Sequence, residues 1–218
     1  MDRLRNAIES TVLAPGAGPG DVHRLVTEAV QLGVVGACVP PRYVGLAREL
    51  AGERPLRIVT VANFPFGYSA PGAVVREIEL VAAAGADEVD VVAPLGLALA
   101  GEWNTYEAEL RTQAEAAAAA GVQLKCILET AALDAAQIRW AAERACAAGV
   151  HWLKTSTGFH PAGGATVDAV AILRSVAPTG VGVKASGGIR DRQIAEAMLA
   201  AGADRIGTSS AARILAGG

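Results

Sequence analysis

One pattern recurs along the chain: an alanine-rich helical stretch ends at an Ala-Gly pair, and an apolar, strand-like stretch follows. The pattern occurs at Ala84-Gly85-Ala86, Ala120-Gly121-Val122, Ala148-Gly149-Val150 and Ala201-Gly202-Ala203. Glycine is favoured there because the residue that follows a helix often adopts a left-handed conformation. The repeat predicts that helices and strands alternate along the chain.

Eight strands are expected from the apolar runs, and a helix or a turn follows each of them. The expected strands are 8–13, 34–39, 56–62, 88–92, 122–128, a run around Lys154, 180–185 and 204–208. The length of 218 residues suits one closed parallel barrel. We therefore expect an α/β fold, a single (β/α)8 TIM barrel with a short N-terminal extension, as one catalytic domain over residues 1–218. An open, doubly wound sheet is the alternative.

Charge and residue usage narrow the expected partners. The formal net charge is −3, which favours neither nucleic acid nor an anionic membrane as a partner. Residues 1–6 lack the apolar core of a signal peptide, and no apolar run approaches the ~20 residues of a membrane span. The cysteines and histidines have no metal-like spacing; they are Cys38, Cys126, Cys146, His23, His151 and His160. We expect a cytoplasmic protein with reduced cysteines and no metal site.

Lysine is rare in this chain. Of the 19 basic residues only Lys125, Lys154 and Lys184 are lysines, and each lies inside a short apolar run. The arginines are spread over predicted helices and loops, and we interpret them as solvating charge. Lysine, unlike arginine, can lose its proton when desolvated and attack a carbonyl to form a Schiff base. The pattern predicts amine chemistry, and the alternative is a set of lysines that reach solvent from strand ends.

Lys154 is placed where a barrel enzyme carries its chemistry. Alternation over 151–158 puts Trp152, Lys154 and Ser156 on one face of a strand that ends at Gly158. Lys154 therefore lies near the C-terminal end of this strand, and barrel active sites form at those ends.

Asp90 is the acidic residue expected to meet the lysines. It lies between Val89 and Val91 and shares a strand face with Glu88. A charge that faces into a barrel is costly unless it is paired, and one aspartate with three lysines meets that condition. A purely structural layer of ion pairs is the alternative.

Neighbouring strands place the backbones of Lys154 and Lys184 roughly 5 Å apart. Two cations this close each lower the pKa of the other, and burial lowers it further. One of the two amines can then act as a nucleophile while the other stays protonated.

Glycine-rich turns follow three successive strands. They contain Gly158, the pair Gly187-Gly188, and the run Gly207-Thr208-Ser209-Ser210. Backbone amides in such turns, together with the start of a final short helix, can bind a phosphate group. The turns predict a phosphate site next to the lysines.

Together these motifs resemble the deoxyribose-phosphate aldolase family. The resemblance rests on Glu88-Val89-Asp90-Val91-Val92, Leu124-Lys125-Cys126-Ile127-Leu128-Glu129-Thr130, Leu153-Lys154-Thr155-Ser156-Thr157-Gly158-Phe159, Val183-Lys184-Ala185-Ser186-Gly187-Gly188-Ile189-Arg190 and Ile206-Gly207-Thr208-Ser209-Ser210. It implies a (β/α)8 barrel and class I aldol chemistry without a cofactor. The implied reaction is the reversible cleavage of 2-deoxy-D-ribose 5-phosphate to acetaldehyde and D-glyceraldehyde 3-phosphate.

The resemblance also implies roles for individual residues. Lys154 would be the nucleophile, Lys184 would stay cationic and keep Lys154 unprotonated, and Asp90 with Lys125 would relay protons through water. The residues implied in phosphate binding are Gly158, Gly187, Gly188, Ser209 and Ser210. The implied partners are small sugar phosphates and aldehydes, and a homodimer is the implied assembly.

The chain departs from the family pattern at three places. The first strand carries Glu9-Ser10-Thr11 instead of an Asp-His-Thr-like run, Ala211 replaces a glycine, and no tyrosine lies near Gly217-Gly218. Two alternatives therefore stay open: another Schiff-base aldolase for sugar phosphates or keto acids, and a catalytically silent barrel that binds sugar phosphates. A zinc aldolase is disfavoured by the histidine spacing.

Overall fold

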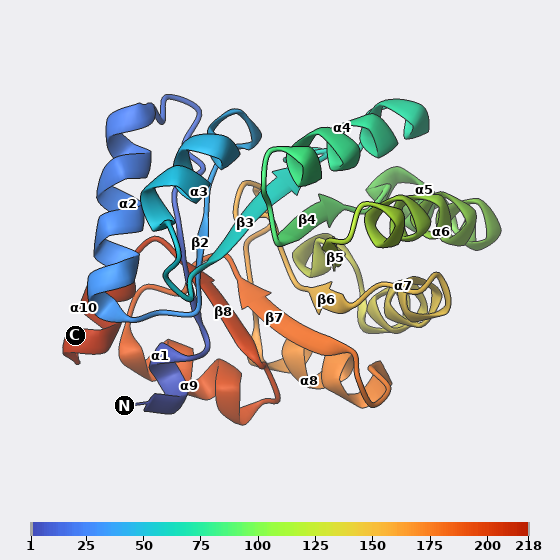
Figure 1. Ribbon diagram of the computed structural model, residues 1–218. Coiled ribbons are helices and arrows are strands. Elements are labelled where there is room, and N and C mark those ends of the chain that lie inside the picture. The colour runs from blue at the N-terminus through green and yellow to red at the C-terminus, as the bar shows by residue number, and fades with distance from the viewer. Residues whose placement is uncertain (1, 218) are drawn as a thin grey trace.

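The computed structural model describes residues 2–217 and has eight parallel strands closed into a barrel (Figure 1). Each strand pairs with the next one along the chain, so the order around the barrel is the order in sequence. The strands are β1 Ile8–Thr11, β2 Gly36–Cys38, β3 Arg57–Ala62, β4 Glu88–Val92, β5 Gln123–Ile127, β6 Trp152–Lys154, β7 Gly182–Ser186 and β8 Arg205–Thr208. All eight predicted strands are present, but several are shorter than the apolar runs that predicted them.

Helices surround the barrel on its outer side (Figure 1). They are α1 Asp2–Arg5, α2 Pro19–Leu32, α3 Val44–Ala51, α4 Pro71–Ala83, α5 Leu95–Ala100, α6 Trp103–Ala119, α7 Ala135–Ala147, α8 Val167–Val176, α9 Arg192–Ala200 and α10 Ala211–Ala216, with short 3-10 turns η1 Pro41–Tyr43 and η2 Thr130–Ala132. The short helix α1 is the N-terminal extension that precedes β1.

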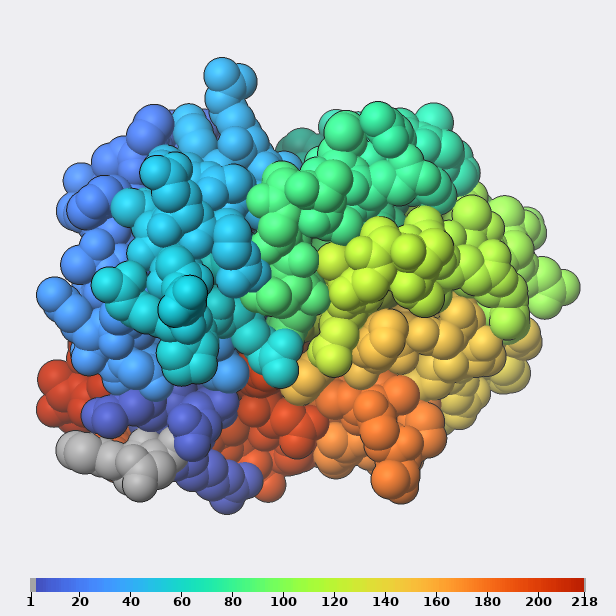
Figure 2. All heavy atoms as spheres, in the orientation of Figure 1, coloured from blue at the N-terminus to red at the C-terminus, as the bar shows by residue number. Residues whose placement is uncertain are grey.

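Pairing of the first strand with the last closes the barrel. Ile8 of β1 is in register with Ile206 of β8, and Ser10 is in register with Thr208. The first and last strands are therefore neighbours, and blue and red atoms from the early and late parts of the chain adjoin at the lower left of Figure 2. This closure confirms the predicted barrel and excludes the open sheet.

The repeated glycines turn each helix back towards the next strand. All four have a positive φ: Gly85 at 102°, Gly121 at 73°, Gly149 at 91° and Gly202 at 110°. Gly202 is also confined by packing, because a Cβ there would lie 2.6 Å from Cγ of Arg174. The predicted role of glycine at the helix ends is thus confirmed.

Alternation along each strand separates two kinds of interior. On β4, Val89 and Val91 belong to the apolar core between strands and helices, whereas Glu88 and Asp90 are buried inside the barrel. On β5, Leu124 joins the apolar core and Lys125 is fully buried among the charges. The outer shell supplies the hydrophobic stability, and this leaves the inside of the barrel free to hold charged groups.

The three cysteines are free thiols. Cys38 and Cys126 are buried, and Cys146 is half-buried.

Across residues 2–217, no helix combines the length and apolarity that crossing a membrane requires.

Candidate active site

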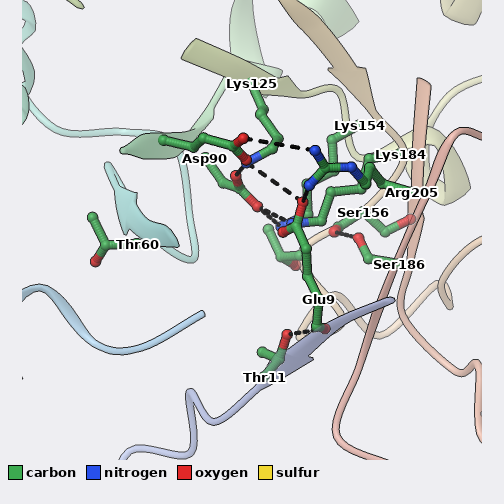
Figure 3. Close-up of polar contacts among 12 residues, drawn as sticks. Glu9, Thr11, Thr60, Asp90, Lys125, Lys154, Ser156, Lys184, Ser186 and Arg205 are labelled. Carbon is green, nitrogen blue, oxygen red and sulfur yellow. Dashed lines mark hydrogen bonds and ion pairs between the residues drawn. The ribbon is translucent and has the colours of Figure 1, made fainter. Parts of the chain in front are cut away.

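The three lysines converge on one aspartate inside the barrel (Figure 3). Nζ of Lys154 lies 2.7 Å from Oδ2 of Asp90, and Nζ of Lys184 lies 2.6 Å from the same oxygen. Nζ of Lys125 lies 2.9 Å from Oδ1. All four side chains are buried, with Lys154 only 3% exposed. The structure therefore brings together the four residues that the sequence analysis selected.

Strand register sets this convergence. Asp90 is in register with Lys125, and Lys154 is in register with Lys184. Because Lys154 is in register with Ile127, it lies two residues further up the barrel than Lys125. Lys154 and Lys184 thus face the mouth of the barrel, whereas Asp90 and Lys125 lie below them.

Three further charged residues belong to the same network, and the sequence analysis gave none of them a role. Glu9 pairs with Lys184 and lies 3.7 Å from Lys125, so the altered first strand still supplies a carboxylate to the site. Glu88 lies 2.5 Å from Lys125. Arg205 Nη1 lies 3.2 Å from Glu9.

The interpretation of the arginines as solvating charge is wrong for Arg205. Its side chain is only 11% exposed, because it pairs with Glu9 and its guanidinium lies 5.0 Å from the centre of the Trp152 ring. The available sequence signal was its place inside the strand run 204–208 rather than on a helix face.

The electrostatics of the two upper lysines differ. Burial lowers the pKa of Lys154, and the neighbouring ammonium of Lys184 lowers it further, so the pKa falls below its usual value although Asp90 opposes this. Burial also acts to lower the pKa of Lys184, but Asp90 and Glu9 outweigh it and raise the pKa. The surroundings thus lower the pKa of one amine and raise the pKa of the other.

The pKa values of Asp90 and Lys125, which lie below the two upper lysines, are shifted so that both charged forms are favoured. Burial acts to raise the pKa of Asp90, but Lys125, Lys154 and Lys184 together hold it well below its usual value. For Lys125, burial is outweighed by Asp90 and Glu9, and the pKa is raised.

A cavity of about 390 Å³ opens above Lys154 and Lys184 at the C-terminal ends of the strands. Its lining includes Thr11 at the end of β1, the following residues Val12–Pro15, and the segments Thr157–Phe159, Ser186–Arg190 and Gly207–Ser209. The predicted phosphate residues Gly158, Gly187, Gly188 and Ser209 all line it. Ser210 is not part of the lining, and its amide donates a hydrogen bond to Oγ1 of Thr208 instead.

Close backbone approach shapes the glycine end of this cavity. Gly158 and Gly187 have φ of 83° and 89°, and Gly188 has φ of 80°. A Cβ on Gly164 would lie 2.3 Å from the carbonyl oxygen of Gly187, so the loop after β6 packs directly on the turn after β7. This packing brings the backbones of Gly158, Gly164 and Gly187 close together at this end of the cavity.

A buried glutamate, not selected from the sequence, holds the loop that carries Gly158. Oγ1 of Thr157 donates to Oε2 of Glu129 at 2.5 Å, and the Thr157 amide donates to the same carboxylate at 3.3 Å. The amide of Phe159 donates to Oγ1 of Thr157. Glu129 has φ of 56°, an uncommon conformation for a residue with a side chain. The hydrogen bonds fix the orientation of the loop on both sides of Gly158.

Among residues 2–217, no three His, Cys, Asp or Glu side chains are grouped so that they could hold a metal ion. Two histidines have other partners: Nδ1 of His151 accepts from the Leu124 amide, and Nδ1 of His160 accepts from the Ala162 amide. His23 is exposed on α2.

The arrangement provides the groups that amine catalysis needs. An amine with a lowered pKa lies at the base of an open cavity, next to an ammonium group with a raised pKa and a carboxylate. Such an amine can attack a carbonyl group, and the neighbouring charges can move the protons that the addition requires.

Comparison with known proteins gives consistent results. The family model described as DeoC/LacD family aldolase matches residues 7–216. A deoxyribose-phosphate aldolase of Thermus thermophilus is 45% identical over 210 residues, covering 96% of this chain and 94% of the relative. One from Corynebacterium jeikeium is 43% identical over 231 residues, covering 95% and 92%.

Solved structures agree with the sequence relatives. The tetrameric deoxyribose phosphate aldolase of Aeropyrum pernix matches with a TM-score of 0.91 and 36% identity, covering 99% of this chain and 93% of that one. A structure described as QR15, an aldolase, matches with a TM-score of 0.92 and 34% identity, covering 98% and 95%.

Proposed function

The chain belongs to the DeoC/LacD family of aldolases, and we propose that it catalyses the reversible cleavage of 2-deoxy-D-ribose 5-phosphate to acetaldehyde and D-glyceraldehyde 3-phosphate. It is a class I aldolase, a carbon–carbon lyase that acts through a lysine Schiff base. The observation that carries the substrate assignment is the cavity itself, in which two lysines and three glycine turns line one space.

Lys154 is the nucleophile in this proposal. It lines the cavity, and its pKa is lowered by burial and by Lys184. Its amine adds to C1 of the open-chain sugar, and loss of water gives a protonated imine. The positive nitrogen then accepts the electron pair of the C2–C3 bond when that bond breaks.

Asp90 and Lys125 relay the protons of these steps through water. Cleavage removes the proton of the C3 hydroxyl and releases glyceraldehyde 3-phosphate, which leaves an enamine on Lys154. Protonation of the enamine at C2 and hydrolysis of the imine then release acetaldehyde and restore the free amine. Asp90 suits the relay because its carboxylate is held ionised within 2.7 Å of Lys154 Nζ.

The phosphate group binds at the glycine end of the cavity. Backbone amides around Gly158, Gly187 and Gly188 supply donors, and Ser209 adds a hydroxyl group. Ser210 contributes through the start of α10 rather than through the lining. The sugar then extends from these turns towards Lys154, which places C1 next to the amine.

The remaining assignments concern the whole molecule. Residues 1–218 act as one catalytic domain, in the cytoplasm, with small sugar phosphates and aldehydes as partners. The chain forms a homodimer in this proposal. Two such dimers would make up a tetramer like the one described for the Aeropyrum pernix relative. A molecular mass of one subunit in light scattering at micromolar concentration would contradict the dimer.

Reductive trapping tests the proposed function. Incubation with 2-deoxy-D-ribose 5-phosphate and borohydride should add a reduced sugar or two-carbon adduct to Lys154, located by peptide mapping. Lys154→Met is the matched control and should take up no adduct at this site. An adduct on Lys125 or Lys184, with Lys154 unmodified, would overturn the assignment. Product analysis that finds no acetaldehyde would point to another Schiff-base aldolase, and no turnover would point to a silent barrel.

A further inference from the structure

Strand-borne charges inside the barrel form one connected network. Its members are Glu9, Glu88, Asp90, Lys125, Lys154, Lys184 and Arg205. Three carboxylates therefore face four basic groups, and full ionisation would leave one uncompensated positive charge in a buried space. Such a charge is costly, so the network is stabilised when one basic group loses its proton.

Arg205 does not lose a proton, because a guanidinium stays charged at all physiological pH values. Its position at the start of β8 is firmly set. Nη1 lies 3.2 Å from Glu9, Nη2 lies 3.9 Å from Glu88, and the guanidinium lies over the Trp152 ring. Gly182 makes room for that ring, because a Cβ there would lie 2.1 Å from it.

The proton must therefore come from a lysine, and the three lysines differ in the carboxylates that they contact. Lys125 contacts Glu9, Glu88 and Asp90. Lys184 contacts Glu9 and Asp90. Of the carboxylates in the described part of the chain, Lys154 contacts Asp90 alone, through an oxygen that it shares with Lys184. Lys154 is thus the least compensated ammonium.

We propose that Arg205 is a positioning residue: its permanent charge partly neutralises Glu9 and Glu88 at the floor of the barrel and thereby makes Lys154 the lysine that carries no proton. The proposal rests on the proposed function, in which Lys154 is the nucleophile. Without Arg205, the three carboxylates would balance three ammonium groups, and Lys154 would keep its proton at neutral pH.

Besides Arg205 on β8, the charged and titratable side chains in and around the network come from each of the other strands. They are Glu9 on β1, Cys38 on β2, Arg57 on β3, Glu88 and Asp90 on β4, Lys125 on β5, Lys154 on β6, Lys184 on β7 and, beyond β5, Glu129. Burial raises the pKa of Cys38 to about 11, so its thiol adds no charge at neutral pH. The carboxylate of Glu129 bonds to Thr157 outside the network. Arg57 lies 3.4 Å from Glu88, but its side chain is 46% exposed.

The test measures the free amine of Lys154 directly. Trace acetylation with isotopic acetic anhydride at a series of pH values, followed by complete acetylation after denaturation, gives the reactivity of each lysine by peptide mapping. In Arg205→Met the midpoint for Lys154 should rise by about one pH unit, so that its reactivity at the pH of the wild-type midpoint falls about fivefold. Arg205→Lys keeps a charge and should restore most of this shift. Superimposed profiles of Arg205→Met and wild type would overturn the proposal.

Further variants serve as controls. Arg57→Met removes a charge that solvent screens, and should move the midpoint by less than half as much as Arg205→Met. Glu9→Gln should lower the midpoint, and adding Arg205→Met to it should raise the midpoint again by about one unit. The double variant leaves no unpaired Glu9 carboxylate. Comparing it with Glu9→Gln therefore tests the role of Arg205 even if Arg205→Met alone does not fold. Equal midpoints in Glu9→Gln and the double variant would refute the role of Arg205.

The outcome separates this inference from the proposed function. Acetylation reports the amine without turnover, whereas borohydride trapping in wild type reports the Schiff base. If wild type gives an adduct on Lys154 but Arg205→Met leaves the midpoint of Lys154 unchanged, the role of Arg205 is refuted and the proposed function stands. An adduct on another lysine refutes the proposed function.

Discussion

Lys154 and Lys184 are register partners on adjacent strands, and their amine nitrogens approach the same oxygen of Asp90, at 2.7 and 2.6 Å. They differ because Lys184 also pairs with Glu9, whereas Lys154 has no second carboxylate among its ion pairs within residues 2–217. The shared oxygen and the additional glutamate together separate the pKa values of two side chains of the same chemical type. The two lysines thus share one carboxylate oxygen, and a change to either lysine should alter the pKa of the other.

Replacing Lys184 should change the pH dependence of catalysis. In Lys184→Met the like-charged neighbour is gone and Oδ2 of Asp90 pairs with Lys154 alone, so the pKa of Lys154 should rise. We expect kcat/KM at pH 7 to fall about 100-fold and to recover partly as the pH is raised. The measurement is a pH–rate profile, and a profile that overlays that of wild type would show that Lys184 does not tune the nucleophile.

Lys184→Arg keeps the charge but should not restore activity. Cε of Lys184 would lie 3.2 Å from a Cβ placed on Gly207, so little space remains for a broader, planar guanidinium. We expect kcat/KM at pH 7 to stay at least about tenfold below that of wild type. Activity equal to wild type would mean that charge alone is sufficient.

Glu129 should control phosphate binding through the loop after β6. Glu129→Ala removes the acceptor of Thr157 and frees the segment next to Gly158, so KM for the phosphorylated sugar should rise about tenfold while kcat changes less. Glu129→Gln keeps an oxygen acceptor and should lie between alanine and wild type. Unphosphorylated 2-deoxyribose is the control substrate. An equal rise in its KM would show that Glu129 supports the site in general and not the phosphate end.

Much of the site was predictable because its residues carry local signals. Lys154 and Asp90 stand out as charges inside apolar runs, and alternation alone gives the face on which each lies. Their meeting also follows once a closed parallel barrel is assumed, because β4 to β7 are neighbours in sequence order.

Glu9 and Arg205 were missed for a different reason. Glu9 meets Lys184 across 175 residues, through the pairing of β8 with β1 that forms only when the barrel closes. The register of that closing pair decides whether Glu9 faces Lys184, and no local pattern sets it. Arg205 is one of many arginines, and its burial depends on the neighbouring Trp152 ring and on the missing side chain of Gly182.

Metal removal should leave the activity unchanged. In the proposed reaction the protonated imine on Lys154 accepts the electron pair of the broken carbon–carbon bond, which is the work that a Lewis acid would otherwise do. Assays after dialysis against excess chelator should therefore match the untreated enzyme within error. Loss of activity that returns on addition of zinc alone would contradict this chemistry.

The buried carboxylate of Asp90 should make the free energy of unfolding sensitive to acid, and Asp90→Asn should reduce this sensitivity. Lys125, Lys154 and Lys184 hold the pKa of Asp90 well below its usual value against the effect of burial. A carboxylate whose pKa is lower in the folded than in the unfolded chain stabilises the fold above its unfolded pKa, near 4, and this contribution is lost as the pH falls towards the folded pKa. The free energy of unfolding of wild type, measured with urea at pH 7, 5 and 3.5, should therefore drop mainly between the last two values.

Asp90→Asn should be less stable at pH 7, because three buried ammonium groups lose a counter-charge, but its stability should fall less on acidification. Asp168→Asn, which alters an exposed carboxylate on α8, is the control and should change the stability at pH 7 by no more than about 0.5 kcal/mol. An equal fall between pH 5 and 3.5 in wild type and in Asp90→Asn would place the acid sensitivity in other carboxylates.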